Sequence, residues 1–349
     1  MTMQSVDSEA KRELHMTIQS NEPKTEPDQP EVLLAKDLRK SYGMRPALRG
    51  LSFSLKAGRI LGFLGPNGAG KTTSIRILTT ILEPTSGHFS VAGIHSDQPE
   101  KIRMKIGVLP ENLGFPKNIT GHEYLTFFGQ LYGLSAAAAK AKATQLLEEV
   151  GLAKRGRSLV GTYSHGMRQR LGIARTLVND PVVVFLDEPT LGLDPRGQQE
   201  LLALVRWVAR EQNVGVILCS HLLSEVESVC DDVIILSSGE VVANGTAAEV
   251  IGQTDRNVIR LRVPSPSLAA ASEVLEDVPG VLSTSSADGN GWIQIEVPDQ
   301  DHGASPQENH LNNIILEAVI GAGIPVLGFE AAGGRLQDVF LKVTEKVIK

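Results

Sequence analysis

The chain has 349 residues with a formal net charge of −6, and only two of its residues are cysteines. Because this length exceeds the roughly 100 to 200 residues of a single domain, we expect two domains. The charge is uneven, with +3 on residues 31–254 and −6 on residues 255–349. Nucleic-acid binding needs a clustered basic face, so this distribution argues against a nucleic-acid partner.

No targeting or membrane-spanning segment is expected. The apolar runs at 182–186 and 216–219 are far shorter than the roughly 18 to 20 residues that cross a bilayer. The first residues are acidic where a signal peptide would be basic and then apolar. Cys219 and Cys230 lie outside any metal-type spacing, which fits a reducing cytosol. We therefore predict a cytoplasmic protein.

Residues 1–30 carry three prolines among charges and lack apolar periodicity, which predicts a disordered leader. The next segments, 32–38 and 48–55, have the composition of strands, with a turn near Tyr42 between them. An aromatic residue at Tyr42 could stack on a nucleotide base or simply belong to the turn.

A glycine-rich segment follows the apolar run 60–64 and opens a helical pattern. We call this segment the phosphate loop; its residues are Gly65, Pro66, Asn67, Gly68, Ala69, Gly70, Lys71, Thr72 and Thr73. The glycines allow successive N–H groups to converge on a phosphate at a helix N-terminus. Lys71 would neutralise the β- and γ-phosphates, and the Thr72 hydroxyl would ligate Mg²⁺.

Two helical segments, 120–132 and 136–150, are predicted as an insertion in an otherwise alternating α/β pattern. The sequence YSHGMRQR at 163–170 then leads into another helix. Ser164 is a good N-cap for that helix, which is a sufficient structural reason for its presence.

Two carboxylates, Asp187 and Glu188, follow the apolar run 182–186. A central parallel strand of this kind delivers its C-terminal residues to the edge of the sheet where ligands bind. Asp187 could hold Mg²⁺ through water, while Glu188 could orient the attacking water. The alternative is a solvated turn.

Two later residues have both a functional and a structural interpretation. Asp194 before Pro195 has the pattern of an N-cap with proline at the first helical position. His221 follows the predicted strand 214–219, where a histidine is more often structural than catalytic.

The C-terminal part has a different pattern, which begins after a polar joint at 253–257. We expect strands at 258–263, 281–285, 292–297 and 325–329, and helices at 268–275 and 311–320. The order βαββαβ is ferredoxin-like. A last helix would present an apolar face that needs a partner surface, formed by Leu336, Val339, Phe340, Val343 and Val347.

Five motifs, GPNGAGKTT, YSHGMRQR, VVVFLDEP, LGLD and SH, occur in this order and resemble those of ABC transporter nucleotide-binding subunits. The resemblance covers 31 to about 252. It implies an α/β fold in which residues 31–252 form a P-loop NTPase domain of the ABC ATPase type, and this domain contains the helical insertion. We assign 257–349 to a small α+β, ferredoxin-like accessory domain and 1–30 to the leader.

The resemblance also implies roles for individual residues in binding and hydrolysing ATP with Mg²⁺. These are Tyr42 on the adenine, Asp187 on magnesium, Glu188 as catalytic glutamate, Asp194 in the dimer loop and His221 on the γ-phosphate. Ser164 and Gly166 would bind the γ-phosphate of ATP held by the opposite subunit. Lys71 completes the catalytic set, and a second copy of the ATPase subunit is the expected partner.

Two positions depart from the family pattern. The signature usually reads LSGGQ, whereas this chain has YSHGM at 163–167. His165 could lie near a phosphate or merely be tolerated on the first helical turn. Glu111 stands where the family usually has a glutamine that contacts the metal and senses the permease, so Glu111 is a candidate metal ligand; Asn112 could instead be the sensor.

These features predict an ATPase that drives a separately encoded membrane permease from the inner face of the cell membrane. The segment LQDVFLKVT (336–344) is similar to the C-terminal segment of drug-exporter-type subunits, which favours export. The chief alternative is a soluble ABC ATPase acting on ribosomes or in DNA repair, which usually carries two nucleotide domains or a long coiled coil. A third possibility is a regulator whose C-terminal domain binds a small ligand.

Overall fold

The computed structural model describes residues 29–112, 114–252, 258–287, 291–298, 308–330, 336 and 339–340. The predicted leader, apart from residues 29 and 30, and the polar joint at 253–257 lie outside the described residues. No helix in the described part of the chain is both long and apolar enough to cross a membrane.

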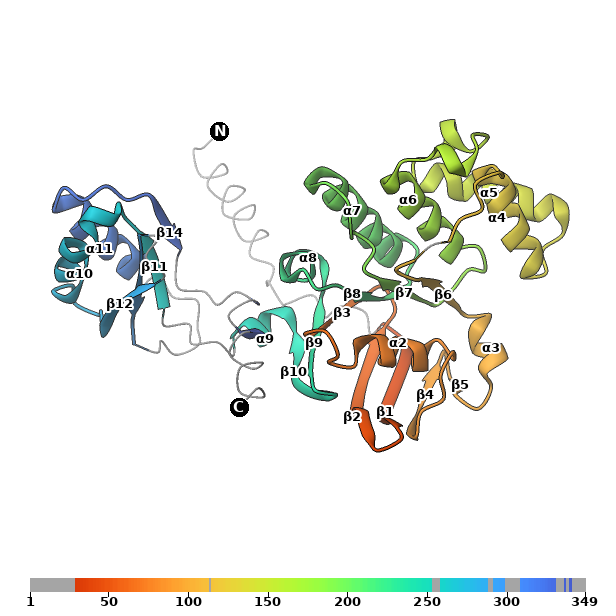
Figure 1. Ribbon diagram of the computed structural model, residues 1–349, viewed down its shortest axis with the longest axis horizontal. Helices are drawn as coiled ribbons and strands as arrows, with labels where there is room; N and C mark the ends of the chain where they lie inside the picture. Colours follow the sequence, from red (N-terminus) through yellow and green to blue (C-terminus); the bar gives the residue numbers. More distant parts are fainter. Residues whose placement is uncertain are drawn as a thin grey trace, which may run out of the picture. The chain divides into compact units, whose positions relative to one another are not determined.

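A six-stranded sheet organises the first part of the chain (Figure 1). Its order is β10-β9-β3-β8-β7-β6. All neighbouring pairs are parallel except β9 with β10. The strands are β3 (Ile60–Leu64), β6 (Ile106–Leu109), β7 (Val183–Asp187), β8 (Gly215–Cys219), β9 (Asp232–Ser237) and β10 (Glu240–Thr246).

The central strands of this sheet are apolar because both of their faces are covered. All five residues of β3 are buried. Ile60 and Leu64 belong to one hydrophobic cluster and Leu61 and Phe63 to another. This alternation follows from the two-residue period of a strand and places a separate core on each side of the sheet.

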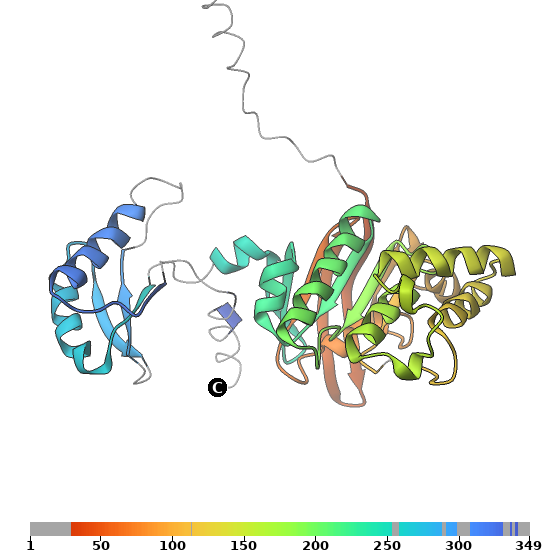
Figure 2. The same cartoon turned by 90° about the horizontal axis from the view of Figure 1, so that it is seen from above.

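Helices cover the first side of the sheet, which Figures 1 and 2 show as green ribbons beside the strands. They are α6 (His165–Thr176), α7 (Pro195–Glu211) and α8 (Leu223–Val229). The apolar faces of these helices are buried in the cluster that contains Ile60, through Leu171 of α6, Leu201 of α7 and Val226 of α8. Helices α6 and α7 therefore start next to the edge where the parallel strands end.

The second side is covered by a four-stranded antiparallel sheet of order β2-β1-β4-β5 and by α2 (Lys71–Leu78). The strands are β1 (Glu31–Tyr42), β2 (Arg45–Lys56), β4 (Ser86–Val91) and β5 (Ile94–His95). β1 and β2 are longer than the sequence predicted. Their polar ends continue the backbone ladder to the pair Tyr42 and Arg45, although apolar alternation has stopped there.

The predicted helical insertion is present as α4 (Gly121–Leu131) and α5 (Ala136–Glu149). Thr120 and Glu123 form a reciprocal capping box at the start of α4, and Ser135 caps α5. Short helices also lie on either side of this insertion in the sequence: α3 (Pro99–Arg103) before it, and η1 (Ala153–Arg155) and η2 (Val160–Thr162) after it.

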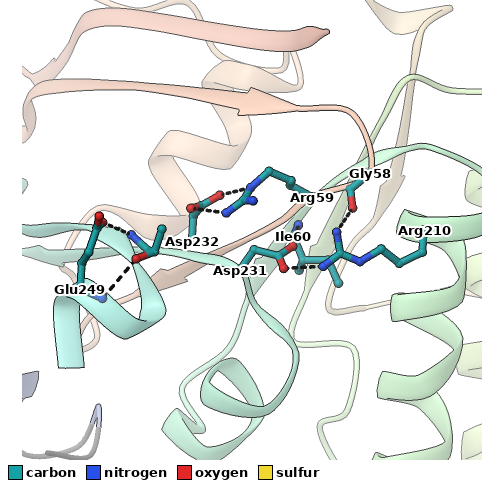
Figure 3. Close-up of polar contacts among 8 residues, drawn as sticks. Gly58, Arg59, Ile60, Arg210, Asp231, Asp232 and Glu249 are labelled. Carbon is teal, nitrogen blue, oxygen red and sulfur yellow. Dashed lines mark hydrogen bonds and ion pairs between the residues drawn. The ribbon is translucent and has the colours of Figure 1, made fainter. Parts of the chain in front are cut away.

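Charged side chains join the strand starts at the edge of the six-stranded sheet opposite the phosphate loop (Figure 3). Nε and Nη2 of Arg59 each donate to an oxygen of the Asp232 carboxylate at 2.8 Å. Asp231 accepts from the Ile60 N–H at 2.8 Å and from Arg210, which also donates to a backbone carbonyl. This network fixes the N-terminal ends of β3 and β9 against the end of α7.

The C-terminal sheet has the order β12-β13-β11-β14, and every neighbouring pair is antiparallel. Together with the observed order βαββαβ, this is the ferredoxin-like arrangement predicted from the sequence. The elements are β11 (Val258–Arg262), η3 (Ser265–Ser267), α10 (Leu268–Glu276), β12 (Ser283–Ala287), β13 (Trp292–Glu296), α11 (Glu308–Gly321) and β14 (Gly328–Glu330). β14 starts three residues later than expected, because its ladder with β11 begins only at Gly328.

Two connecting features differ from the sequence prediction. A helix that was not predicted, α9 (Ala247–Gly252), follows β10, and its Thr246 and Glu249 form a further reciprocal capping pair. Leu336 and Val339 of the predicted last helix are buried in the cluster that contains Ile60, so their apolar face has a partner surface within this chain. Val343 and Val347 lie outside the described residues.

Candidate nucleotide-binding site

The phosphate loop has the backbone conformation that its glycines permit. Gly65, Gly68 and Gly70 have φ values of 150°, 82° and 110°, which side chains strongly disfavour. A Cβ on Gly65 would lie 2.3 Å from the Leu236 carbonyl oxygen. Gly65 is therefore required by both its conformation and its packing.

Helix α2 starts within this segment, at Lys71, and its N-cap residue Gly70 provides no side-chain cap. Because glycine has no side chain, no carboxylate or hydroxyl of the cap residue lies in front of the free N–H groups of the first helical turn. This end of the helix carries a partial positive charge. The geometry suits an anion such as a phosphate.

The Lys71 ammonium lies back over the loop and donates to the carbonyl oxygens of Gly65 and Pro66, the latter at 3.2 Å. Both acceptors are neutral backbone groups. A phosphate oxygen is a stronger acceptor for an ammonium, because the bond is then between opposite charges. Lys71 is thus placed at the loop with a charge that an anionic ligand can pair.

Asp187 ends β7 and Glu188 follows it, as the sequence predicted. Glu188 has a left-handed backbone with φ of 49°, which is unfavourable for a residue with a side chain. Its N–H bonds the Cys219 carbonyl of the neighbouring strand β8 at 2.9 Å. Strained backbone of this kind is concentrated at functional sites.

His221 follows β8 and turns toward Glu188. Its Nδ1 lies 2.8 Å from Glu188 Oε2, and because a carboxylate only accepts, Nδ1 carries the proton. Ser220 supports the turn: its hydroxyl donates to the buried Glu225 and accepts from the N–H of Leu222. The bond to the Glu188 carboxylate and the bonds that fix the turn at Ser220 therefore hold the imidazole in place.

The site is electrostatically negative on its sheet side. Burial raises the pKa of Asp187 above its ordinary value, and the charges of Glu188 and Glu111 raise it further. Lys71 and Arg76 act in the opposite direction on the same pKa. The three carboxylates are thus close enough to repel one another, and a bound cation would relieve that repulsion.

A cavity of about 430 Å³ brings most of the predicted site together. It is lined by Ala47, Asn67, Gly68, Ala69, Gly70, Lys71, Thr72, Thr73, Glu111, Asp187, Glu188, Leu191 and His221. The sequence assigns an individual role to all of these except Ala47 and Leu191, the latter being the first residue of the LGLD motif. Its size and its convergent polar groups are those of a small-molecule site.

Three predicted residues line a different hollow, about 450 Å³ in volume. They are Ser164, Gly166 and Asp194. Ser164 accepts from the N–H of Met167 and so caps α6, while Asp194 accepts from the N–H of Gly197 and caps α7. The structural interpretation of both caps is therefore correct, and both residues also face this second hollow.

Tyr42 lines neither cavity. Half of its surface is exposed, and the Lys40 ammonium lies 5.8 Å from its ring centroid. The ring is available at the end of β1, but its stacking role stays a prediction.

Mg²⁺ and ATP fit the residues that are present. No group of three or more His, Cys, Asp or Glu side chains in the described part of the chain is placed to hold a metal by itself. Asp187 and the Thr72 hydroxyl are hard oxygen donors in the same cavity. Mg²⁺ is commonly bound by one or two protein oxygens together with phosphate oxygens and water, so this sparse set of donors suits it.

Two features of the site were not predicted from the sequence. Ala47 comes from the β1–β2 hairpin, and its carbonyl oxygen would lie 2.8 Å from a Cβ on Gly70. Such contacts depend on the packing of one sheet on another and carry no local motif. The bond between His221 and Glu188 was also missed, although both residues follow parallel strands and adjacent strand ends are a signal that could have suggested it.

Comparison with known proteins identifies the family. The family model described as ABC transporter matches residues 48–191. The linearmycin resistance ATP-binding protein LnrL of Bacillus subtilis is 37% identical over 65% of this chain and 73% of its own. The bacitracin transport ATP-binding protein BcrA of Bacillus licheniformis is 33% identical over 89% of this chain and 97% of its own.

Solved structures agree with the sequence comparisons. The structure of an ATP-binding subunit of an ABC transporter is 33% identical and superimposes with a TM-score of 0.56 over 64% of this chain and 92% of that chain. The chain belongs to the ABC transporter family and is one of its ATP-binding subunits, with the ABC ATPase fold. Its class of activity is therefore that of an ATPase.

Proposed function

We propose that this protein hydrolyses MgATP at a dimer interface and thereby drives export through a separately encoded membrane permease. The observation that carries this proposal is the division of the site. The phosphate loop, Asp187, Glu188 and His221 line one cavity, while the signature residues Ser164 and Gly166 line another. One chain therefore offers two half-sites, which a second chain would complete.

The first half-site suits binding and hydrolysis. The N–H groups of the phosphate loop and Lys71 would hold the β- and γ-phosphates, and the Thr72 hydroxyl and Asp187 would hold Mg²⁺. Bound Mg²⁺ would neutralise charge on the phosphate oxygens. Glu188 would orient the attacking water, and the proton on Nδ1 of His221 would keep the Glu188 carboxylate in place.

The second half-site would serve the partner. Ser164 starts α6 with its N-terminus directed into the hollow that it shares with Gly166 and Asp194. The N-terminus of this twelve-residue helix favours an anion, so the γ-phosphate of ATP held by a second copy of the chain is a suitable ligand. Asp194 would contact that copy across the interface.

The helical insertion offers a surface for the permease. Phe127 and Leu131 lie one turn apart on α4, and both have more than half of their surface exposed. Exposed apolar residues grouped on one face mark an interaction surface. The names of LnrL and BcrA refer to resistance and transport, which supports export; a location at the inner face of the membrane would follow from binding to the permease.

Purification of the full-length chain from membranes of its native host tests the partner. The permease should co-purify with the parent, and Phe127→Glu should lose it while keeping ATP hydrolysis. Ile320→Glu is the matched control, because Ile320 is equally exposed but lies on α11 of the C-terminal part. Co-purification with ribosomal or repair proteins in place of a membrane protein would instead support a soluble ABC ATPase.

Glu111 is proposed to couple hydrolysis to the permease. It lines the nucleotide cavity and its charge acts on Asp187, so a change in its position would be felt at the metal site. Glu111→Gln is expected to keep basal ATP affinity within a few fold. In the reconstituted complex, Glu111→Ala should respond to cargo less than the parent does, and an undiminished response would contradict the coupling role.

A further inference from the structure

His165, one of three signature residues that differ from the family pattern, bonds a loop of its own chain. Its Nε2 lies 2.8 Å from the carbonyl oxygen of Leu191. Leu191 belongs to the segment 188–194, which joins β7 to α7 and which we call the connecting loop. His165 itself is the first residue of α6, next to the N-cap Ser164.

The glycine next to Leu191 lies beside this imidazole. Gly192 has φ of 77°, a conformation that favours glycine, and a Cβ built on it would lie at ordinary van der Waals contact, 3.5 Å, from His165 Nε2. Because a carbonyl oxygen only accepts, Nε2 must carry the proton that is donated. Neutral imidazole and imidazolium can both meet that requirement.

Pro189 and Thr190 of the connecting loop are buried, but among the described residues the other hydrogen bonds that join this loop to the rest of the chain are at its ends. Glu188 bonds Cys219 on the neighbouring strand, and Asp194 caps α7. Between them, the bonds from Leu191 N–H to Glu188 and from Leu193 N–H to Thr190 are internal to the loop, at 3.2 and 3.1 Å. The bond from His165 thus fixes the middle of the loop to another element.

The loop also connects the two half-sites. Leu191 lines the nucleotide cavity, whereas Leu193 and Asp194 line the hollow that contains Ser164. A Cβ on Gly166 would lie 3.6 Å from Leu193, so α6 packs on the loop at a second point. A displacement of α6 would be transmitted directly to residues beside Glu188.

We propose that His165 is a positioning residue that ties the start of α6 to the connecting loop, so that occupation of the second hollow is felt at Glu188 of the same chain. A glycine, which the family signature usually has at this position, has no side chain with which to form this bond. The kinetic consequence rests on the proposed dimeric mechanism, but the tie itself is a property of one chain.

Two substitutions separate the hydrogen bond from the bulk of the ring. His165→Gln retains an N–H donor at the same distance from the backbone, whereas His165→Phe retains a ring without a donor. His122→Ala is the matched control, because this half-buried histidine contacts Thr144 on the helical insertion and lines neither cavity. Thermal unfolding of all variants serves to establish that each is folded.

Hydrogen exchange of the full-length chain, without nucleotide, measures the tie directly. Peptides covering 188–194 should exchange about 3- to 10-fold faster in His165→Phe, as expected for the loss of one hydrogen bond, and at the parental rate in His165→Gln and His122→Ala. Parental exchange in His165→Phe, or equal acceleration in His165→Gln, overturns the tie.

ATP hydrolysis then tests its consequence. The kcat of His165→Phe should fall about 3- to 10-fold with little change in the KM for ATP, because the phosphate loop is untouched, and His165→Gln should restore it. Faster exchange combined with a parental kcat overturns the role in turnover. If transport and permease binding fail instead, the proposed function is at fault, while the exchange result stands unaffected.

Discussion

His221 Nδ1 and Glu188 Oε2 lie 2.8 Å apart, although 33 positions separate the two residues in the sequence. The contact arises because β7 and β8 are adjacent parallel strands and each residue follows the end of its strand. Half of the His221 side chain is exposed, whereas Glu188 is mostly covered. The carboxylate is therefore oriented before any nucleotide is present.

Glu188→Gln is expected to bind ATP and lose turnover. The amide oxygen can still accept from His221, so the cavity keeps its shape, but the water loses its carboxylate. We expect kcat to fall roughly 100-fold or more with little change in nucleotide affinity. Lys71→Ala is the contrasting variant and should weaken binding itself. Steady-state hydrolysis near the parental rate in Glu188→Gln would remove Glu188 from its proposed role.

The left-handed backbone of Glu188 predicts a separate effect on stability. Both Glu188→Ala and Glu188→Gly remove the carboxylate, but only glycine adopts φ of 49° without steric cost. The glycine variant should therefore be more stable than the alanine variant by about 1 kcal/mol, although both lack hydrolysis. Denaturant unfolding of the two proteins measures this difference. Equal stability would mean that the strain is not present in solution.

Asp187 makes the stability of the nucleotide-free protein depend on pH. Its pKa is raised in the folded state by burial and then by Glu188 and Glu111. The folded chain therefore holds this proton more tightly than the unfolded chain does, and stability is lost as pH rises through the raised pKa. Asp187→Asn removes this loss.

The Tm of Asp187→Asn should accordingly exceed that of the parent at pH 8, and the difference should shrink as the pH is lowered. Differential scanning calorimetry across this range provides the test. The groups that face Asp187 are Lys71 and Arg76 in addition to the two glutamates, and none of them is changed. A difference that grows on acidification has the wrong sign for this account.

Removing the charged network at the edge of the sheet opposite the phosphate loop should lower the stability of the fold without lowering ATP hydrolysis. Asp231→Ala removes the acceptor of both the Ile60 N–H and Arg210 (Figure 3). We expect a loss of about 1.5–3 kcal/mol in the free energy of unfolding, since both bonds are made to a charged carboxylate. ATP hydrolysis by the folded fraction should be unchanged, because the network lies at the strand starts.

Asp97→Ala is the matched control for this measurement. Asp97 is exposed and, among the described residues, forms an ion pair with His95 alone, at 3.3 Å, so its removal should change the free energy of unfolding by less than about 0.5 kcal/mol. If the two aspartate variants were equally stable, the network would not contribute to the fold.

The sequence predicted the phosphate loop, the strands at 60–64, 182–186 and 214–219 and the position of Asp187 and Glu188 well, because each depends on a local pattern. Gly65 and Gly70 are dictated by positive φ and close backbone approach, and these three strands by continuous apolar runs. The βαββαβ order of the C-terminal part was likewise readable from alternating apolar patterns.

What the sequence did not predict depends on contacts between distant segments. Ala47 enters the cavity only because the β1–β2 hairpin packs beside the loop, and His165 meets Leu191 only because α6 and α7 start at the same sheet edge. From the sequence, His165 is either a residue near a phosphate or a tolerated substitution on the first helical turn. Neither interpretation includes its hydrogen bond to Leu191, and His165 also lines the second hollow.

Sedimentation with ATP tests the two-chain site most directly. Glu188→Gln should form dimers in ATP, because it binds the nucleotide without consuming it, and adding Ser164→Arg to the same chain should abolish them. Mixing the two single variants creates one intact composite site and one doubly damaged site, so hydrolysis should reappear above that of either variant alone. Equal dimerisation with and without Ser164→Arg, and no recovery of hydrolysis on mixing, would contradict the account.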